Sequence, residues 1–187
     1  MIIGITGTNG AGKGTVVEYL VQKKGFAGYS VRTAITEEII RRGLEVTRPN
    51  LNEVATDLRE IHGPGYFSEL FIKRAKDEDI ENIVIESIRN PLEAEALKTQ
   101  GGIIFVVDAD RKVRYERITE RASETDKVSF EEFCAQEDRE MNSEDPTNPA
   151  KMSINAVIKV ADYKIENNRT LEELHAQIDA LPIFSST

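Results

Sequence analysis

The chain has 187 residues, of which 40% are hydrophobic and 30% charged, and its formal net charge is -9. This length suits one domain with a full hydrophobic core, and the composition excludes a disordered or fibrous protein. The acidic balance excludes a general basic field that would draw the chain to nucleic acid or to an anionic membrane, so any bound phosphate must meet local positive groups.

The first elements alternate between strand and helix patterns. Residues 2–6 form an apolar run that predicts a buried strand, and a glycine-rich loop and an amphipathic helix ending before Gly25 follow it. Residues 29–34 predict a second strand. Thr36 predicts the cap of a helix that runs to Gly43.

Two helices are expected in the next part of the chain. Asn50 and Glu53 resemble a capping box, and apolar residues recur at helical spacing until the turn at residues 63–65. A further helix is expected over residues 66–77.

Strand and helix patterns alternate again in the middle of the chain. Residues 83–85 predict a buried strand, and Asn90 predicts the cap of a helix over residues 91–100. The continuous β-branched and aromatic run at residues 103–107 is typical of a strand buried on both faces of a parallel sheet. A charged helix is expected around residues 111–122.

The last part contains two more predicted helices and one strand. Ser129 opens a helix through a capping box, and residues 142–150 have the composition of a loop. Residues 163–166 predict a short strand, and Thr170 caps a final helix that Pro182 ends. This alternation predicts a single three-layer α/β/α domain over residues 1–187, with helices on both faces of a parallel sheet.

The segment GTNGAGKGT is the strongest chemical signal. A glycine-rich turn between a buried strand and a helix aims backbone N–H groups at one point, where the helix dipole also favours an anion. Lys13, exposed in such a loop, adds a mobile ammonium group for the β and γ phosphates of a nucleotide. The alternative is a glycine-rich turn with a surface lysine. The predicted nucleotide-binding residues are Gly7, Asn9, Gly10, Ala11, Gly12, Lys13, Gly14 and Thr15.

The hydroxyl residue of this loop is displaced by one position. Gly14 follows Lys13, and the hydroxyl comes next, at Thr15. The form GxxGxGKGT resembles the phosphate loop of adenylate kinase and other nucleoside-monophosphate kinases. The resemblance implies ATP and Mg²⁺ as cofactors, with the metal held through water near Thr15, and a five-stranded sheet in the order 2-3-1-4-5.

The end of the third predicted strand extends the resemblance. Glu86 followed by Arg89 is similar to the DGxR-like strand end of small nucleotide kinases. The resemblance implies that Glu86 orients metal-bound water and that Arg89 holds a phosphate and takes part in catalysis. The alternative is a local ion pair at a strand end.

The segment from Asp108 to Arg121 resembles the fourth strand end and following helix of dephospho-coenzyme A kinase. Arg114, Arg117 and Arg121 lie on one helical face. The resemblance implies that arginines of this helix, Arg117 and Arg121 among them, reach the transferred phosphoryl group. The alternatives are a solvated charged face and, for Asp108, a carboxylate at a helix N-terminus.

Residues 161–174 resemble the ADxxIxNxGxxEEL segment of the same kinases. The resemblance implies that Asn167 and Asn168 lie against the adenine, while Arg169 stands where those kinases more often have glycine. The alternative is a plain turn rich in asparagine.

A cluster of arginines lies between the second and third predicted strands. The pattern RxNL followed by LRExxG resembles small deoxynucleotide and archaeal nucleotide kinases. The resemblance implies an acceptor-binding helical insert over about residues 36–78, and surface arginines are the alternative. The predicted acceptor-binding residues are Arg41, Arg48, Arg59, Glu86 and Arg89.

These patterns lead to one functional hypothesis and two alternatives. We expect ATP-dependent phosphoryl transfer to a small phosphorylated acceptor, with a nucleoside or deoxynucleoside monophosphate as first candidate and a lid-like segment over about residues 111–150. The alternatives are a dephospho-coenzyme A kinase and a nucleotide-binding regulatory ATPase.

The sequence also predicts where the protein works. Cys134 cannot form an internal disulfide and is expected to be a packed thiol. No apolar run approaches the length of a membrane span, and the chain enters directly as a strand without a charged leader. We therefore expect a cytoplasmic monomer or homodimer with a small-molecule partner and no nucleic-acid or membrane partner.

Overall fold

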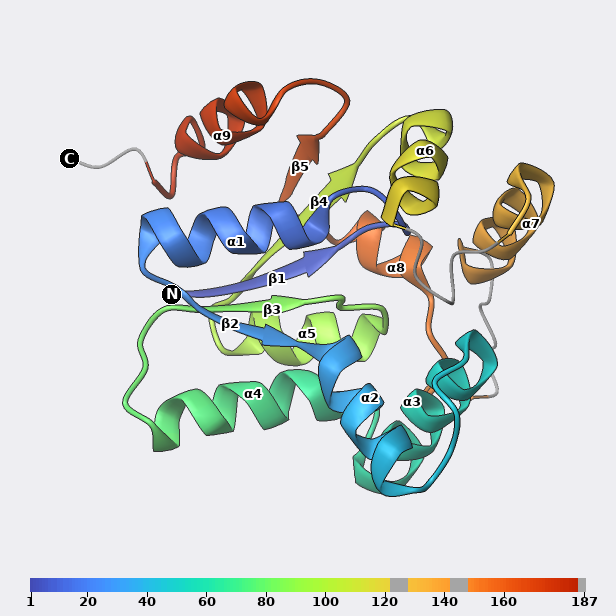
Figure 1. The fold of residues 1–187 in the computed structure, drawn as a ribbon. Helices are drawn as coiled ribbons and strands as arrows, with labels where there is room; N and C mark the ends of the chain where they lie inside the picture. Colours follow the sequence, from blue (N-terminus) through green and yellow to red (C-terminus); the bar gives the residue numbers. More distant parts are fainter. Residues whose placement is uncertain (122–127, 142–147, 185–187) are drawn as a thin grey trace.

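A five-stranded parallel sheet forms the centre of the protein (Figure 1). The structure, a computed structural model, describes residues 1–121, 128–141 and 148–184. The strand order is β2-β3-β1-β4-β5 and every neighbouring pair is parallel, as the sequence predicted. The strands are β1 (Ile2–Thr6), β2 (Ala27–Ser30), β3 (Ile83–Glu86), β4 (Ile103–Asp108) and β5 (Tyr163–Glu166).

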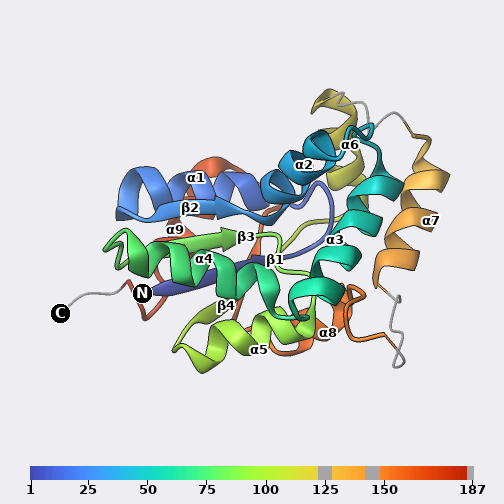
Figure 2. The same ribbon diagram turned by 90° about the horizontal axis from the view of Figure 1, so that it is seen from below.

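Helices cover both faces of this sheet (Figures 1 and 2). One face carries α1 (Lys13–Lys24) and α9 (Leu171–Asp179). The other carries α4 (Tyr66–Asp77), α5 (Pro91–Thr99) and α8 (Ile154–Lys159). The helices beyond the carboxyl ends of the strands are α2 (Val31–Arg41), α3 (Arg48–His62), α6 (Arg111–Arg121) and α7 (Phe130–Met141). The three-layer prediction is therefore confirmed.

The alternation of side chains along the strands divides the core into two clusters. Ile3, Val84 and Phe105 pack on the side of α1 and α9. Ile85 and Ile104 point the other way, toward α4 and α5. Because successive strand residues face opposite sides, these apolar runs are buried on both faces of the sheet. This two-sided burial holds the carboxyl ends of the strands in fixed positions.

The boundary between the second strand and its helix was predicted wrongly. β2 ends at Ser30, whose hydroxyl accepts a hydrogen bond from the backbone N–H of Thr33 and caps α2. Thr36, the predicted cap, lies inside that helix. Val31 and Ile35 are both buried, and helical spacing places them on one face. Burial of this face therefore decides where the helix begins.

Two other helices differ from the prediction. Thr47 rather than Asn50 caps α3, so this helix begins earlier than expected. Helix α8, capped by Ser153, was not predicted. The predicted loop over residues 142–150 lies outside the described residues as far as position 147.

Several predicted caps are confirmed. Asn90 caps α5, and the Ser129–Glu132 capping box precedes α7. Thr170 caps α9, but that helix ends at Asp179, before Pro182. None of the helices in the described ranges combines the length and the apolar content needed to span a bilayer.

Candidate functional site

The phosphate loop connects β1 to α1 at the carboxyl edge of the sheet (Figure 1). Gly7 has φ of +134°, and a Cβ there would lie 2.1 Å from the carbonyl oxygen of Val107. Gly12 has φ of +93°, and its Cβ would lie 2.0 Å from the side-chain nitrogen of Asn167. Only glycine fits at these two positions. These glycines therefore let the loop backbone turn closely beside the amino end of α1, which is the arrangement that an anion site requires.

Lys13 is folded back against the loop rather than exposed as the sequence suggested. Its ammonium group donates to the carbonyl oxygens of Gly7 and Thr8, at 3.0 and 2.8 Å. The residue is only 8% exposed. Burial, with the nearby charge of Arg89, lowers the pKa of Lys13 to about 7, although Glu86 and Glu140 act in the opposite direction.

This pKa predicts that nucleotide binding takes up a proton. At pH 8 about nine tenths of Lys13 is neutral, and a triphosphate beside it would restore the charge. Uptake should approach about one proton at pH 8 and fall to about a tenth at pH 6. Calorimetric titration with ATP in buffers of different ionisation enthalpy measures this uptake. Equal uptake by wild type and Lys13→Ala at pH 8 would contradict the assignment of the proton to Lys13.

The two residues predicted to act on a metal lie close to the amino end of α1. Thr15 is in the first turn of the helix, and Glu86 is the last residue of β3. An oxygen of Glu86 lies 3.9 Å from where a Cβ at Gly14 would be. No group of three or more carboxylate, histidine or cysteine ligands occurs among the described residues. One carboxylate and one hydroxyl fit an Mg²⁺ ion that keeps most of its water ligands.

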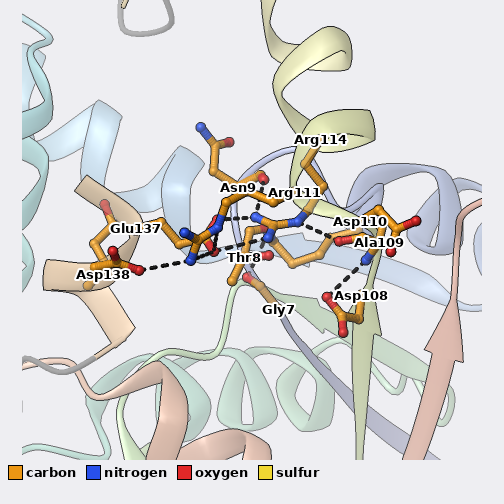
Figure 3. A network of polar contacts seen from close by, with 12 residues as sticks. Gly7, Thr8, Asn9, Asp108, Ala109, Asp110, Arg111, Arg114, Glu137 and Asp138 are labelled. Atoms are coloured by element: carbon orange, nitrogen blue, oxygen red, sulfur yellow. Dashed lines mark hydrogen bonds and ion pairs between the residues drawn. The ribbon is translucent and has the colours of Figure 1, made fainter. Parts of the chain in front are cut away.

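Arg114 has a different environment from the one its helical position suggested. Its guanidinium group is buried against the Glu137 carboxylate of α7 and donates to the carbonyl oxygen of Ala109 at 2.7 Å. Figure 3 shows Arg111 and Arg114 of α6 pointing toward α7, beside the phosphate-loop residue Asn9. Arg114 thus joins α6 to α7. Arg114 is therefore removed from the arginines predicted to reach the transferred phosphoryl group, and Arg117 and Arg121 stay predicted for that role.

Arg117 and Arg121 reach the phosphate loop from α6. Arg117 lies 3.5 Å from the side-chain oxygen of Asn167. One of its nitrogens is buried without a hydrogen-bond partner among the described residues, and lies 4.0 Å from where a Cβ at Gly12 would be. Arg121 donates to the side chain of Asn9 at 3.3 Å. Both guanidinium groups therefore stand beside the loop that would hold phosphates.

The asparagines after β5 support the loop around them. Asn167 is buried, and its amide donates to the carbonyl oxygen of Ala11 at 3.0 Å. Asn168 accepts from the backbone N–H of Asp110 at 2.7 Å. Both side chains therefore contact backbone, so their predicted contact with adenine stays a prediction. Asp108, the last residue of β4, accepts from the backbone N–H of Ala109 at 2.9 Å and pairs with Lys164.

Arginines from distant parts of the chain line one pocket between α2, α3, α7 and the end of β3. Its volume is about 60 Å³. Asn9 of the phosphate loop also lines it, so the pocket opens beside that loop. The arginines are Arg32, Arg48, Arg59 and Arg89. The prediction that Arg41 binds the acceptor is corrected. Its side chain is 74% exposed, pairs with Glu38, and does not line the pocket.

The backbone of Ser87 adds strain at the same pocket. This residue has φ of +71°, a conformation that non-glycine residues rarely adopt, and it lies between Glu86 and Arg89. Such strain persists where the surrounding structure fixes it, and it is frequent at functional sites.

Sequence reasoning missed Glu140, the carboxylate that lines this pocket. Its two oxygens pair with Arg48 at 2.6 Å and with Arg89 at 3.3 Å. Burial alone would raise the pKa of the Glu140 carboxyl, but the charges of Arg89 and Arg48 outweigh it and hold that pKa below its ordinary value. A signal was present: Phe133, Glu137 and Glu140 recur at helical spacing, so both glutamates share a face with a core residue.

The fold and the loop together define the class of protein: an α/β P-loop protein whose solved neighbours include kinases. A shikimate kinase from Acinetobacter baumannii in complex with shikimate has a TM-score of 0.60 and 19% identity, covering 97% of this chain and 92% of that chain. TT1252 from Thermus thermophilus has a TM-score of 0.54 and 22% identity, covering 100% of this chain and 98% of that one. At these identities the comparison shows the fold alone.

The chain belongs to the AAA-domain family, whose model matches residues 3–145, and to the UPF0200 proteins. UPF0200 protein PH1008 of Pyrococcus horikoshii is 32% identical, over 96% of this chain and 94% of that protein. UPF0200 protein TK1334 of Thermococcus kodakarensis is 29% identical, over 97% and 96%. The predicted membership of the P-loop nucleoside-monophosphate-kinase-like family is confirmed, and this kinase-like fold implies nucleotide binding.

Proposed function

We propose that the protein transfers a phosphoryl group from ATP to a small phosphorylated acceptor, with nucleoside and deoxynucleoside monophosphates as first candidates. The arginine-lined pocket beside the phosphate loop carries this proposal. In a chain of net charge -9, arginines from four separate positions converge there. Arginine binds phosphate through a planar pair of donors, so such a pocket suits a phosphorylated ligand.

The proposed roles follow from the positions around the loop. Lys13 and the loop amides would hold the β and γ phosphates of ATP, with Mg²⁺ held through water by Glu86 and Thr15. Arg117 and Arg121 would stabilise the charge on the transferred group, because both stand beside the loop. Positioning and charge stabilisation carry this reaction, so no covalent intermediate is required.

The pocket must widen to admit an acceptor. Its volume of about 60 Å³ is well below the roughly 150 Å³ of a cavity that accepts a molecule the size of benzene. Within the predicted insert over residues 36–78, α3 supplies one wall of the pocket. The first residues of α2, which precede the insert, and Glu140 of α7 supply others. We therefore keep the lid-like segment over residues 111–150 as part of the proposal, although residues 122–127 and 142–147 lie outside the described part.

One assay separates the proposed kinase from its alternatives. ADP release is measured with ATP and Mg²⁺ against ribonucleoside and deoxynucleoside monophosphates, dephospho-coenzyme A and shikimate. Stimulation by a monophosphate supports the proposal, whereas stimulation by dephospho-coenzyme A alone supports that kinase instead. Shikimate tests the hydroxyl acceptor with which the solved shikimate kinase is complexed. Slow ADP release that no acceptor stimulates would favour the regulatory ATPase.

Arg89→Ala should impair use of the acceptor far more than binding of ATP. Arg89 lines the pocket and has a charged partner there, and loss of one charge-assisted contact raises KM by about 10–100-fold. ATP affinity should change by less than about threefold. Arg41→Ala is the matched control, because Arg41 is exposed outside the pocket. Loss of ATP binding with an unchanged acceptor KM would place Arg89 on the nucleotide side.

The cytoplasmic location and the monomeric or homodimeric state remain predictions from the sequence. Size-exclusion chromatography with light scattering tests the oligomeric state directly.

A further inference from the structure

We propose that Arg48 and Arg89 form the phosphate subsite of the acceptor, and that Glu140 is an internal carboxylate that competes with the acceptor's phosphate for it. This inference rests on the proposed function for the identity of the ligand. Its geometry stands on contacts within the chain.

The carboxylate of Glu140 bridges the two arginines. One oxygen accepts from Nε and Nη2 of Arg48, at 2.9 and 2.6 Å, and the other accepts from Arg89 at 3.3 Å. These residues lie far apart in sequence, and all three side chains line the same pocket. A phosphate could accept from the same donors, because its oxygens match the arginine fork as a carboxylate does.

Charge explains why phosphate could replace the carboxylate. Among the described residues that line the pocket, Glu140 is the one with a carboxylate, and it faces Arg48 and Arg89. The charge of Arg59 is already paired with the buried Glu93. A phosphate monoester carries up to two negative charges and offers three terminal oxygens, against one charge and two oxygens for Glu140. The arginine cluster therefore attracts the acceptor's phosphate more strongly than it attracts the carboxylate.

The elements that carry Arg48, Arg89 and Glu140 indicate which of these residues would move. Arg89 lies three residues after the end of β3, and its carbonyl oxygen accepts from the backbone N–H of Ser153 at 2.8 Å. Arg48 begins α3, whose inner face belongs to the core. Glu140 comes from the last turn of α7, a helix outside the sheet layers (Figure 2). Displacement of α7 would therefore expose both arginines without disturbing the sheet.

Contacts between α6 and α7 would couple this displacement to the transferred phosphoryl group. The ring of Tyr115 lies 5.2 and 5.6 Å from the rings of Phe130 and Phe133, and Arg114 is buried against Glu137. These contacts join α7 to the helix that carries Arg117 and Arg121. Binding of the acceptor's phosphate would thus shift Arg117 and Arg121, which already stand beside the phosphate loop. Without acceptor, Glu140 would hold α7 in place and so restrain ATP hydrolysis.

Titration with inorganic phosphate tests the subsite without any enzymatic activity. Wild type, Glu140→Gln and Glu140→Ala are compared by calorimetry, with Glu131→Gln on the exposed face of α7 as control. Both Glu140 variants should bind phosphate at least about tenfold more tightly than wild type and the control, because the competing charge is gone. The double variant Glu140→Gln/Arg48→Ala should lose this gain. Thermal melts with phosphate confirm that each variant is folded and that phosphate stabilises it.

Several results would overturn the inference. Phosphate affinity that does not rise in folded Glu140→Gln would show that the carboxylate does not compete. A gain that survives Arg48→Ala would place the ion in the phosphate loop instead.

An enzymatic readout distinguishes competition from a chemical role. With an acceptor that stimulates ADP release, Glu140→Gln should lower the acceptor KM and raise hydrolysis without acceptor, while kcat stays within about threefold. A fall in kcat of about a hundredfold would make Glu140 part of the reaction, as a base would be, and would overturn the inference. If no acceptor stimulates wild type, the proposed function fails, but the phosphate titration still decides the subsite.

Discussion

Replacing Lys13 with alanine should reduce ATP affinity by about 10–100-fold and turnover by on the order of a thousandfold. The ammonium group lies within the phosphate loop, against the carbonyl oxygens of Gly7 and Thr8. Loss of one charge-assisted contact accounts for the expected fall in ATP affinity. Turnover should fall further, because the same charge would act on the phosphoryl group as negative charge develops on its oxygens.

Calorimetric titration with ATP and steady-state ADP release measure the two effects. Lys23→Ala is the control, since Lys23 is exposed in the last turn of the same helix. Unchanged ATP binding in a folded Lys13→Ala protein would contradict the assignment of residues 7–15 as the phosphate loop.

The stability of the Lys13 variant should depend on pH in a defined direction. Burial lowers the pKa of Lys13 from 10.5 to about 7, so the unfolded chain binds more protons than the folded chain between these values. Stability due to this residue therefore rises with pH across that window. The melting temperature of wild type minus that of Lys13→Ala should increase from pH 7 to pH 10.

The sheet and the phosphate loop could be predicted because their signals are local. The run at residues 103–107 is apolar throughout, which only a strand buried on both faces explains well. The glycines at positions 7 and 12 are required by close contacts of the loop itself. Asn90 and Ser129 were correctly predicted as caps, because each stands immediately before a helical pattern.

Helix starts with two candidate caps were predicted less well. Ser30 stands before Val31 and Ile35, whereas Thr36 stands after them. Thr47 and Asn50 both precede the apolar residues of the next helix. Burial of Val31 selects the earlier start in the first case. In the second, Thr47 accepts the bond from the backbone of Asn50. Local preference alone does not contain this tertiary information.

The roles of the arginines required long-range contacts that the sequence does not display. Arg114, Arg117 and Arg121 have equivalent helical spacing, yet Glu137 of α7 pairs with the first of them. Glu140 similarly pairs with Arg48 from 92 positions away. Spacing within one helix predicts which residues share a face, but it does not predict which side chains of other elements contact that face.

Arg59→Ala should lower the free energy of unfolding by about 3–5 kcal/mol, because it leaves a buried carboxylate unpaired. Arg59 and Glu93 are 2% and 0% exposed, and their ion pair measures 2.7 Å. The second oxygen of Glu93 has no hydrogen-bond partner among the described residues, so Arg59 supplies the compensating charge. For a domain of this size the loss corresponds to a fall in melting temperature of roughly 6–20 °C. Denaturant unfolding and thermal melts measure it.

A double variant separates the structural role of Arg59 from its proposed contact with the acceptor. Arg59→Met/Glu93→Leu removes both charges and keeps apolar volume beside the ring of Phe67, so it should recover most of the stability that Arg59→Ala loses. If Arg59 also binds the acceptor's phosphate, as its place in the arginine-lined pocket suggests, the stable double variant should still show an acceptor KM raised by about tenfold. An acceptor KM equal to that of wild type would make Arg59 a structural partner of Glu93 alone. The phosphate would then be held by Arg48 and Arg89 without it.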